Sequence, residues 1–345
     1  MGHSGDSMQR PPSATYQRRL IFILGLTFGV VFFDRNAVSF LAPLMQDELG
    51  LNFTQIGLLS SGLSLTWALA GMFGGAISDR TGSRKTPLLV AIVAFSLCSF
   101  ISGLAVSFAT LLVARLLMGI AEGPILPISQ SLVAEQSATE RRGHNMGVMQ
   151  NVGSALLGSF AAPLVLIALA RTFGWREAFY LAGVPGLVMA WLIWRYVHER
   201  APDAGAAVLV RAAAAANAPV SVFGLFGYRN MVLCMLISIV MVTWMILGWV
   251  FLPQYYTQVR GMDPSEMSWQ VSVLGLSAAS SAFIVPRLSD RYGRRPIVLL
   301  FCLVGLIVPL AAMHFHGPDY LLATLVFLGW FAAGTFPIFM GTIPS

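Results

Sequence analysis

The sequence predicts an all-α polytopic membrane protein, and three observations support this fold class. Hydrophobic residues make up 57% of the 345 residues and charged residues only 10%, whereas a soluble domain usually carries about 25% charged residues. Apolar segments long enough to cross a bilayer, which takes about 20 helical residues, recur along the whole chain. Arg and Lys gather in alternate connections between these segments, as they do in multi-pass proteins.

Ten apolar segments are candidate spans, and most are joined by short connections that carry Gly, Pro or charge. Residues 1–19 are polar and predict a cytoplasmic N-terminal tail, and 20–197 predict a six-helix bundle. Residues 198–229 are rich in alanine and predict a cytoplasmic linker, which leaves a partial bundle of four helices in 230–345. The ten spans are 20–42, 53–78, 86–106, 108–133, 146–170, 177–197, 230–256, 266–288, 296–316 and 320–343.

The distribution of basic residues predicts the orientation. With a cytoplasmic N-terminus, sixteen of the 21 Arg and Lys residues fall in cytoplasmic segments, three in outer loops and two inside spans. This bias predicts a multi-pass protein of the inner (plasma) membrane. It also accounts for the net charge of +6 through contact with the lipid bilayer, without a nucleic-acid partner.

No motif for cofactor chemistry stands out. Cys98, Cys234 and Cys302 lie in separate apolar segments, which favours small core residues over a disulfide framework or a metal site. We find no Walker motif, no dinucleotide fingerprint and no pairing of a nucleophile with a base. The sequence therefore predicts that the protein is neither an enzyme nor an ATP-driven pump. It also predicts that the protein binds no metal or cofactor. We expect a monomer.

An internal repeat follows the second span of each predicted half. Its pattern in 78–85 is S-D-R-x-G-x-R-[KR]. The second copy, 289–295, matches the first seven positions of this pattern. The glycines permit a tight turn, and the charges predict cytoplasmic contacts that form in one state and break in another. The alternative is that these residues only fix the topology, and the two roles are compatible. The gate candidates are Gly75, Asp79, Arg80, Gly82, Arg84, Asp290, Arg291, Gly293 and Arg294.

This repeat resembles the signature loop of the major facilitator superfamily, although Pro286 stands where the family usually has glycine. The resemblance implies the major facilitator fold, which has twelve helices in two halves of six, each built from inverted triplets. Ten spans then correspond to a complete six-helix bundle and a four-helix partial bundle. The resemblance implies that helices eleven and twelve are absent from this chain.

Four charges lie inside predicted spans, where charges are costly and mark functional sites. Asp34 and Arg35 belong to the first span, Arg115 and Glu122 to the fourth. Arg115 and Glu122 are seven residues apart, so they share one helix face about 10 Å apart along the axis. The arginines suit an anionic substrate and the carboxylates can take up protons. The alternative is that the four charges merely neutralise one another.

A closer resemblance is to the anion:cation symporter family, carried by the segments 33–36, 115–124 and 249–255. It implies proton-driven symport of a small organic anion, such as a sugar acid, by rocker-switch alternating access. Arg35 and Arg115 would face the substrate, and Asp34 and Glu122 would couple protons. Spinster-like lipid carriers share the Asp-Arg pair and the Glu, so a lipid or drug efflux carrier stays open.

Two further candidates for substrate binding are Gln150 and Tyr255. Gln150 lies early in the fifth span, in a glycine-rich stretch, and its amide suits substrate hydroxyl groups. An interhelical hydrogen bond is an equal alternative for it. Tyr255 ends the Trp249–Tyr255 motif of the seventh span, and its alternative is the aromatic belt of the membrane interface.

Overall fold

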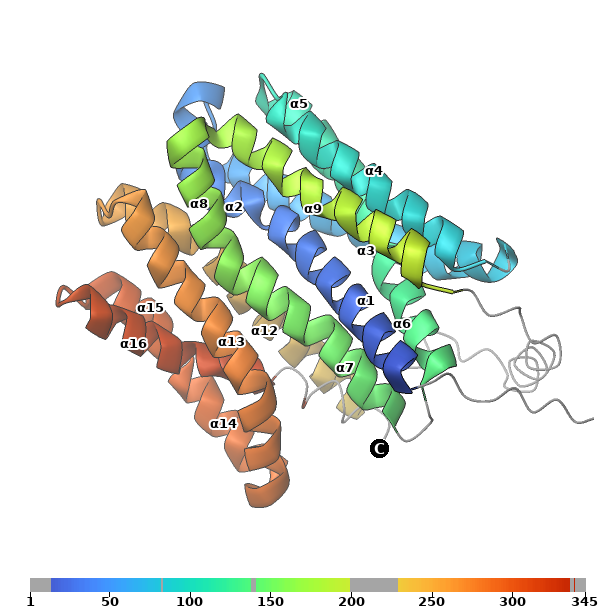
Figure 1. Cartoon of the computed structure of the whole chain (residues 1–345). Helices are drawn as coiled ribbons and strands as arrows, with labels where there is room; N and C mark the ends of the chain where they lie inside the picture. The colour runs from blue at the N-terminus through green and yellow to red at the C-terminus, as the bar shows by residue number, and fades with distance from the viewer. Residues whose placement is uncertain (1–13, 82, 138–140, 199–228, 336–337, 339–345) are drawn as a thin grey trace, which may run out of the picture.

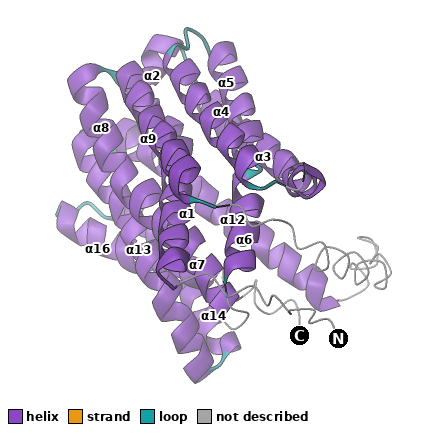
Figure 2. Ribbon diagram, turned by 45° about the vertical axis from the view of Figure 1, so that its right-hand side comes forward, coloured by secondary structure: helices purple, strands orange, loops and turns teal. Residues whose placement is uncertain are grey.

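The computed structural model describes residues 14–81, 83–137, 141–198, 229–335 and 338. Throughout these ranges the regular elements are helices, without a strand (Figure 2). Most helices lie side by side in two groups, the first coloured from blue to yellow-green and the second from yellow to red (Figure 1). The all-α membrane fold that the composition predicts is therefore confirmed.

The first half contains six spans, several of them divided into two elements. Its elements are α1 (Ala14–Arg35), α2 (Ala37–Leu49), α3 (Phe53–Thr81), α4 (Lys85–Gly103), α5 (Phe108–Glu122), α6 (Ile125–Gln136), α7 (Arg142–Gly153), the π-helix η2 (Ser154–Ala161), α8 (Ala162–Phe173) and α9 (Trp175–Tyr196). The second half consists of α12 (Arg229–Gln254), the π-helix η3 (Tyr255–Val259), α13 (Pro264–Tyr292), α14 (Arg294–Val304), α15 (Ile307–His314), α16 (Asp319–Trp330) and the 3₁₀-helix η4 (Phe331–Thr335).

Nine segments of the described chain are long and apolar enough to cross a membrane, and they coincide with the first nine predicted spans. The tenth prediction, 320–343, corresponds to a shorter apolar helix, Asp319–Thr335. Most of the rest of that range lies outside the described residues. The predicted linker, 198–229, lies outside them except at its two ends.

Helix α1 extends into the predicted N-terminal tail. It begins at Ala14, before the predicted first span, and its polar N-terminal part has partners at the end of α9. The amide of His198 donates to the Tyr16 hydroxyl at 2.9 Å, and the Arg19 guanidinium lies 5.1 Å from the centre of the Tyr196 ring. Interactions of this kind stabilise a helix beyond its apolar stretch, and an apolar-segment boundary does not detect them.

Helices α3 and α5 approach closely at the small residues of the fourth span. A Cβ added to Gly119 would lie 2.1 Å from Thr66 Oγ1 and 2.4 Å from the carbonyl oxygen of Leu63. A Cβ added to Gly123 would lie 2.7 Å from the amide nitrogen of Gly71. This is the close packing that small residues four apart predict in a membrane helix, and it holds α5, with its charges, against α3.

We expect Gly119→Ala to destabilise the protein, because the added methyl group meets the α3 backbone at Leu63 and Trp67 as well as the short side chain of Thr66. Overpacking of this kind costs about 1–3 kcal/mol. Gly147→Ala is the matched control, since that helical glycine has nothing within 4 Å of an added Cβ. Thermal unfolding of the purified protein in detergent measures both. Equal melting temperatures for the two variants would contradict the close packing.

The connections 50–52, 174 and 260–263 lie at one end of the bundle, which we call the Gly174 end. Arg176 at the start of α9 pairs with Glu48 near the end of α2. Arg171 near the end of α8 pairs with Asp263, the N-cap of α13. The second pair joins the two halves of the molecule.

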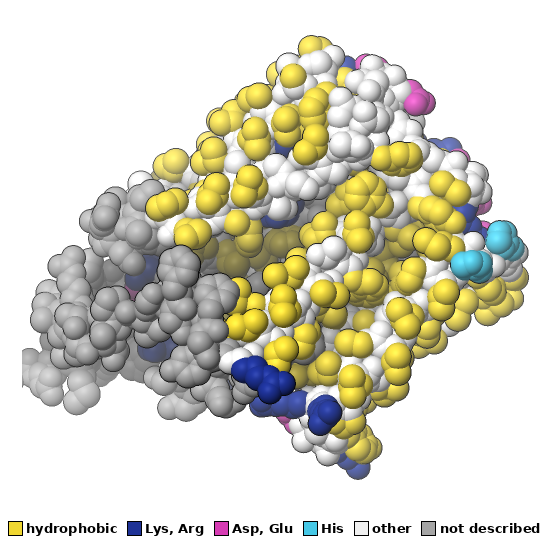
Figure 3. Space-filling model, turned by 180° about the vertical axis from the view of Figure 1, so that it is seen from behind, with side chains coloured by type: hydrophobic (Ala, Val, Ile, Leu, Met, Phe, Trp, Pro, Cys, Tyr) yellow, Lys and Arg dark blue, Asp and Glu magenta, His cyan; other side chains and the backbone are white. Residues whose placement is uncertain are grey.

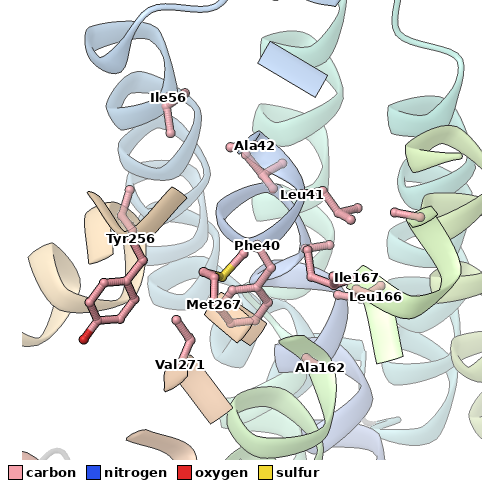
Figure 4. Packing of buried hydrophobic residues seen from close by; sticks show 14 of the residues in the cluster. Phe40, Leu41, Ala42, Ile56, Ala162, Leu166, Ile167, Tyr256, Met267 and Val271 are labelled. Carbon is pink, nitrogen blue, oxygen red and sulfur yellow. The ribbon is translucent and has the colours of Figure 1, made fainter. Parts of the chain in front are cut away.

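A buried hydrophobic cluster also joins the halves (Figure 4). It combines side chains of α2, α3 and α8 with side chains of η3 and α13. Those labelled are Phe40, Leu41, Ala42, Ile56, Ala162, Leu166, Ile167, Tyr256, Met267 and Val271. Deeper along α13, a Cβ added to Gly275 would lie 2.4 Å from the carbonyl carbon of Ser159 in η2. The halves thus meet through packed side chains near the Gly174 end and through backbone at Gly275.

Candidate functional site

The four predicted intramembrane charges come together inside the first half. Asp34 is 0% exposed, and Arg115 and Glu122 are each 1% exposed. The side chain of Arg35 is 15% exposed, so it is the most accessible of the four. Asp34 and Arg35 form the last turn of α1, and Arg115 and Glu122 lie on the buried face of α5. The prediction that two turns of one helix present both charges on the same face is confirmed.

Arg35 is held by α3 and α5. Its Nη1 lies 3.5 Å from Glu122 Oε2, and its Nη2 donates to the Ser64 hydroxyl at 3.1 Å. The guanidinium also lies 4.8 Å from the centre of the Trp67 ring, within the range of a cation–π interaction. The guanidinium is thus positioned by one carboxylate, one hydroxyl and one aromatic face, from three sides.

Arg115 lies deeper, between α1, α5 and α9. Its Nη1 donates to the main-chain oxygen of Asp34 at 3.4 Å and contacts Met118 Sδ at 3.2 Å. Its guanidinium lies 5.0 Å from the centre of the Phe179 ring. In this conformation Arg115 is therefore enclosed by the six-helix bundle, and Arg35 is the more exposed of the two arginines.

The cluster has unused hydrogen-bonding capacity within the described chain. Both carboxylate oxygens of Asp34 and of Glu122, and Nε and Nη2 of Arg115, lack a hydrogen-bond partner. Buried polar atoms are nearly always hydrogen-bonded, and an unpaired one is costly. A site with this many free donors and acceptors is suited to bind a proton, water or an anionic group.

A break follows the charged pair on each helix. Asn36 separates α1 from α2, and its side-chain amide donates to the carbonyl oxygen of Gly158 in η2 at 2.9 Å. Gly123 and Pro124 separate α5 from α6, and Pro124 has no N–H to continue the helical ladder. The charges therefore lie beside short interruptions of the regular helices, and discontinuous helices are common at transport sites.

The other two substrate-binding candidates have contacts with residues other than these charges. The Gln150 side chain accepts a hydrogen bond from Gln130 Nε2 at 3.3 Å, which links α7 to α6. Tyr255 begins η3 in the second half, and its ring centre lies 6.4 Å from that of Tyr256. Trp249 of the same motif lies edge-on to Phe40, with ring centres 6.4 Å apart. The roles of Gln150 and Tyr255 in binding stay predictions.

The repeated loops lie at the end of the bundle opposite Gly174. In the first copy, Gly75, Asp79 and Arg80 are helical residues of α3, and the structure describes only their backbone. Gly82 lies outside the described residues. Arg84 Nε pairs with Glu135 Oε1 of α6 at 2.6 Å, a contact within the first half.

In the second copy, Asp290, Arg291 and Arg294 are exposed at the junction of α13 and α14. Gly293 has a φ of +93°, which favours glycine. The prediction of a tight glycine turn is thus confirmed for the second copy.

The sequence interpretation missed four residues of the site. Ser64 and Trp67 lie three apart on α3, on the face that meets Arg35, and this spacing was the available signal. Ser99 and Phe179 lie on α4 and α9 beside Asp34 and Arg115. Nothing in their local sequence distinguishes them from other core residues, because only the packing of three helices brings them to the charges.

Comparison with known proteins decides the family. The sequence profile of the Major Facilitator Superfamily matches residues 24–252 and 233–345. The chain belongs to this superfamily. One curated relative of this superfamily member is the Hexuronate transporter of Bacillus subtilis (strain 168), which is 31% identical over 82% of the chain and 69% of the relative. Another is the Probable 4-methylmuconolactone transporter of Cupriavidus pinatubonensis (strain JMP 134 / LMG 1197), which is 30% identical over 87% of the chain and 69% of the relative.

Among solved structures, the superfamily fold recurs in an inward-facing, unoccupied crystal structure of a bacterial homologue of the human lysosomal transporter Spinster. The TM-score is 0.71 at 21% identity, and the likeness covers 93% of this chain and 75% of the other. At this identity the likeness is one of fold. The predicted superfamily and its likeness to organic-anion carriers are confirmed, and the chain is a multi-pass transporter rather than an enzyme.

Proposed function

We propose that this transporter moves a small organic anion, such as a sugar acid, together with protons. The observation that carries the proposal is the pairing of Arg35 with Glu122. The partly exposed guanidinium of Arg35 can bind an anion, and the enclosed carboxylate of Glu122 competes with that anion for it. The name of the Bacillus relative, a hexuronate transporter, supports a carboxylate as the transported group.

The pairing suggests how anion and proton binding are linked. A substrate carboxylate that approaches Arg35 competes with Glu122 for the same guanidinium. An ionised Glu122 left without Arg35 in an enclosed site would be costly, so release of Arg35 favours a protonated Glu122. The substrate anion and the proton therefore stabilise each other in the site. The driving force is the proton gradient, and the mechanism requires no metal or cofactor.

The arrangement of the halves supports alternating access by rocking. They are joined at the Gly174 end by the hydrophobic cluster and by Arg171 with Asp263. A hollow flanked by hydrophobic side chains runs between two lobes of the molecule (Figure 3). With a cytoplasmic N-terminus in the inner membrane, the Gly174 end faces outward, and this conformation is closed to the outside.

Arg171 also contacts the Ser265 hydroxyl, so it holds the first turn of α13. The pKa of Asp263 is held below its ordinary value, mainly because the Ser265 amide donates to the carboxylate at 2.9 Å, and further by the Ser265 hydroxyl and Arg171. A lowered pKa means that the interaction is present above the ordinary pKa and is lost only as the pH falls through the folded value. The contact thus stays charged at neutral pH.

We expect Arg171→Glu to shift the conformational equilibrium toward molecules open at the Gly174 end. The shift is at most a few-fold, because exposed ion pairs contribute little. The double variant Arg171→Glu, Asp263→Arg restores the attraction and the original equilibrium. Labelling of a cysteine placed on the α8 side of the contact measures the open fraction. Unchanged labelling in the single variant would exclude a role for this pair in closing the outer side.

The proposed function is tested with purified protein in proteoliposomes. We expect a radiolabelled hexuronate, supplied outside, to accumulate when the vesicle interior is alkaline, and to stop accumulating when a protonophore dissipates the gradient. Lysolipid supplied in parallel should not be transported. Uptake that is indifferent to the pH gradient would contradict proton coupling, and transport of lysolipid without any carboxylate would favour the lipid-carrier alternative.

A further inference from the structure

Helix α4 carries three buried serines at intervals of three residues. Ser96, Ser99 and Ser102 are each 0% exposed. Ser96 donates to the carbonyl oxygen of Ile92 at 3.0 Å, and Ser102 to that of Cys98 at 2.8 Å. Both hydroxyls thus bond within their own helix, four residues back, which is the ordinary arrangement for a buried serine in a helix.

Ser99 differs because its hydroxyl leaves α4. It donates to the carbonyl oxygen of Phe179 in α9 at 2.9 Å. The ring of the same Phe179 lies against the Arg115 guanidinium, whose Nη1 bonds the main chain of Asp34. The Ser99 hydroxyl also lies close to the Asp34 carboxylate. Ser99 therefore lies between the Phe179 carbonyl, which accepts its hydrogen bond, and the Asp34 carboxylate, which has no hydrogen-bond donor among the described residues.

Besides Ser99, the potential donors near Asp34 are Cys98 and the two arginines, and Nε and Nη2 of Arg115 are themselves without a partner among the described residues. Arg115 and Glu122 face it from α5, Cys98 and Ser99 from α4, and Arg35 follows it on α1. Arg35 is engaged with Glu122 and Ser64, and the Arg115 contact is to the main-chain oxygen of Asp34. Both oxygens of the Asp34 carboxylate lack a hydrogen bond among the described residues.

We propose that Ser99 is a positioning residue for proton coupling: its hydroxyl donates to the Phe179 carbonyl while Asp34 holds a proton, and turns to the Asp34 carboxylate when that proton leaves. A hydroxyl has one proton to donate and rotates about a single bond, so it serves one acceptor at a time. A bond to an ionised carboxylate is about twice as strong as one to a neutral oxygen. The inference rests on the proposed function, which is proton-coupled transport, and on the role in proton coupling that the family resemblance implies for Asp34.

The test is a direct titration of Asp34 in the purified full chain, without substrate. The carboxyl C=O stretch is followed by infrared difference spectroscopy as the pH is raised, and Asp34→Asn identifies its band. In Ser99→Ala we expect the midpoint to move to higher pH by about one to two units, because the ionised form has lost its donor. Ser99→Thr keeps a hydroxyl and should return the midpoint toward that of the original protein.

Ser96→Ala and Ser102→Ala are the matched controls, since each removes an equally buried hydroxyl from the same helix. Their midpoints should stay unchanged. A midpoint in Ser99→Ala equal to these controls overturns the proposal, as does the absence of any band removed by Asp34→Asn. Because no substrate is present, failure of organic-anion transport would appear in the proteoliposomes and not in this titration. Melting temperatures verify that each variant is folded.

Discussion

Arg35→Gln should abolish uptake of the organic anion while the protein still inserts into the membrane. The variant removes the docking group and leaves Glu122 enclosed without its ion-pair partner. Loss of one partner from a buried hydrogen-bonded charge pair costs about 2–5 kcal/mol, so we expect substrate affinity to fall at least about 30-fold. Binding is measured by isothermal calorimetry in detergent, and uptake in proteoliposomes.

The loss in Arg35→Gln has two components that a second variant separates. In the double variant Arg35→Gln, Glu122→Gln the carboxylate that Arg35 leaves unpaired is also removed, so thermal stability should return while anion binding does not. Arg35→Lys keeps the charge but not the planar fork that grips a carboxylate at two points, so it should recover only part of the affinity. Anion binding by Arg35→Gln at the original affinity would refute the docking role.

Glu122→Gln should separate exchange from accumulation. The amide resembles the protonated carboxyl group in shape and charge, so Arg35 is free for the anion in every state of the cycle. We expect counterflow of labelled against unlabelled substrate to persist, while accumulation driven by a pH gradient falls to the background of empty vesicles. Both are measured on the same vesicle preparation.

Asp47→Asn is a suitable control for the charge change, because Asp47 is an exposed residue of α2 that belongs neither to the charged site nor to the repeated loops. It should accumulate substrate in response to the gradient. Accumulation by Glu122→Gln against a concentration gradient, at the level of this control, would show that the coupling proton binds elsewhere.

The sequence was sufficient for the spans and for the charged residues of the site. Apolar segments of about 20 residues locate the first nine spans, because a bilayer imposes a minimum helix length. Asp34, Arg35, Arg115 and Glu122 were predictable because a charge inside an apolar run is rare and costly. Their burial on facing helices agrees with that prediction.

The pairing of those charges could not be derived from the sequence. Asp34 and Arg35 are neighbours in the chain, but successive helical residues point in different directions, and Arg35 pairs with Glu122 of α5. The partners Ser64, Trp67 and Phe179 come from two helices, α3 and α9, whose rotation is set by close packing, as at Gly119. The helical conformation of 14–19 could not be derived from the apolar pattern, because its polar side chains contact 196–198 and lie outside the apolar stretch.

The π-helix η2 contacts both the segment that carries Arg35 and the second half of the molecule. Asn36, next to Arg35, is tied to Gly158, and the following residue, Ser159, touches Gly275 of the other half. The path from Arg35 to Gly275 thus consists of two peptide-bonded neighbour pairs and the two contacts between them. We therefore expect a displacement at Arg35 to reach the second half through the main chain and the Asn36 amide, because neither a long side chain nor a loop lies between them.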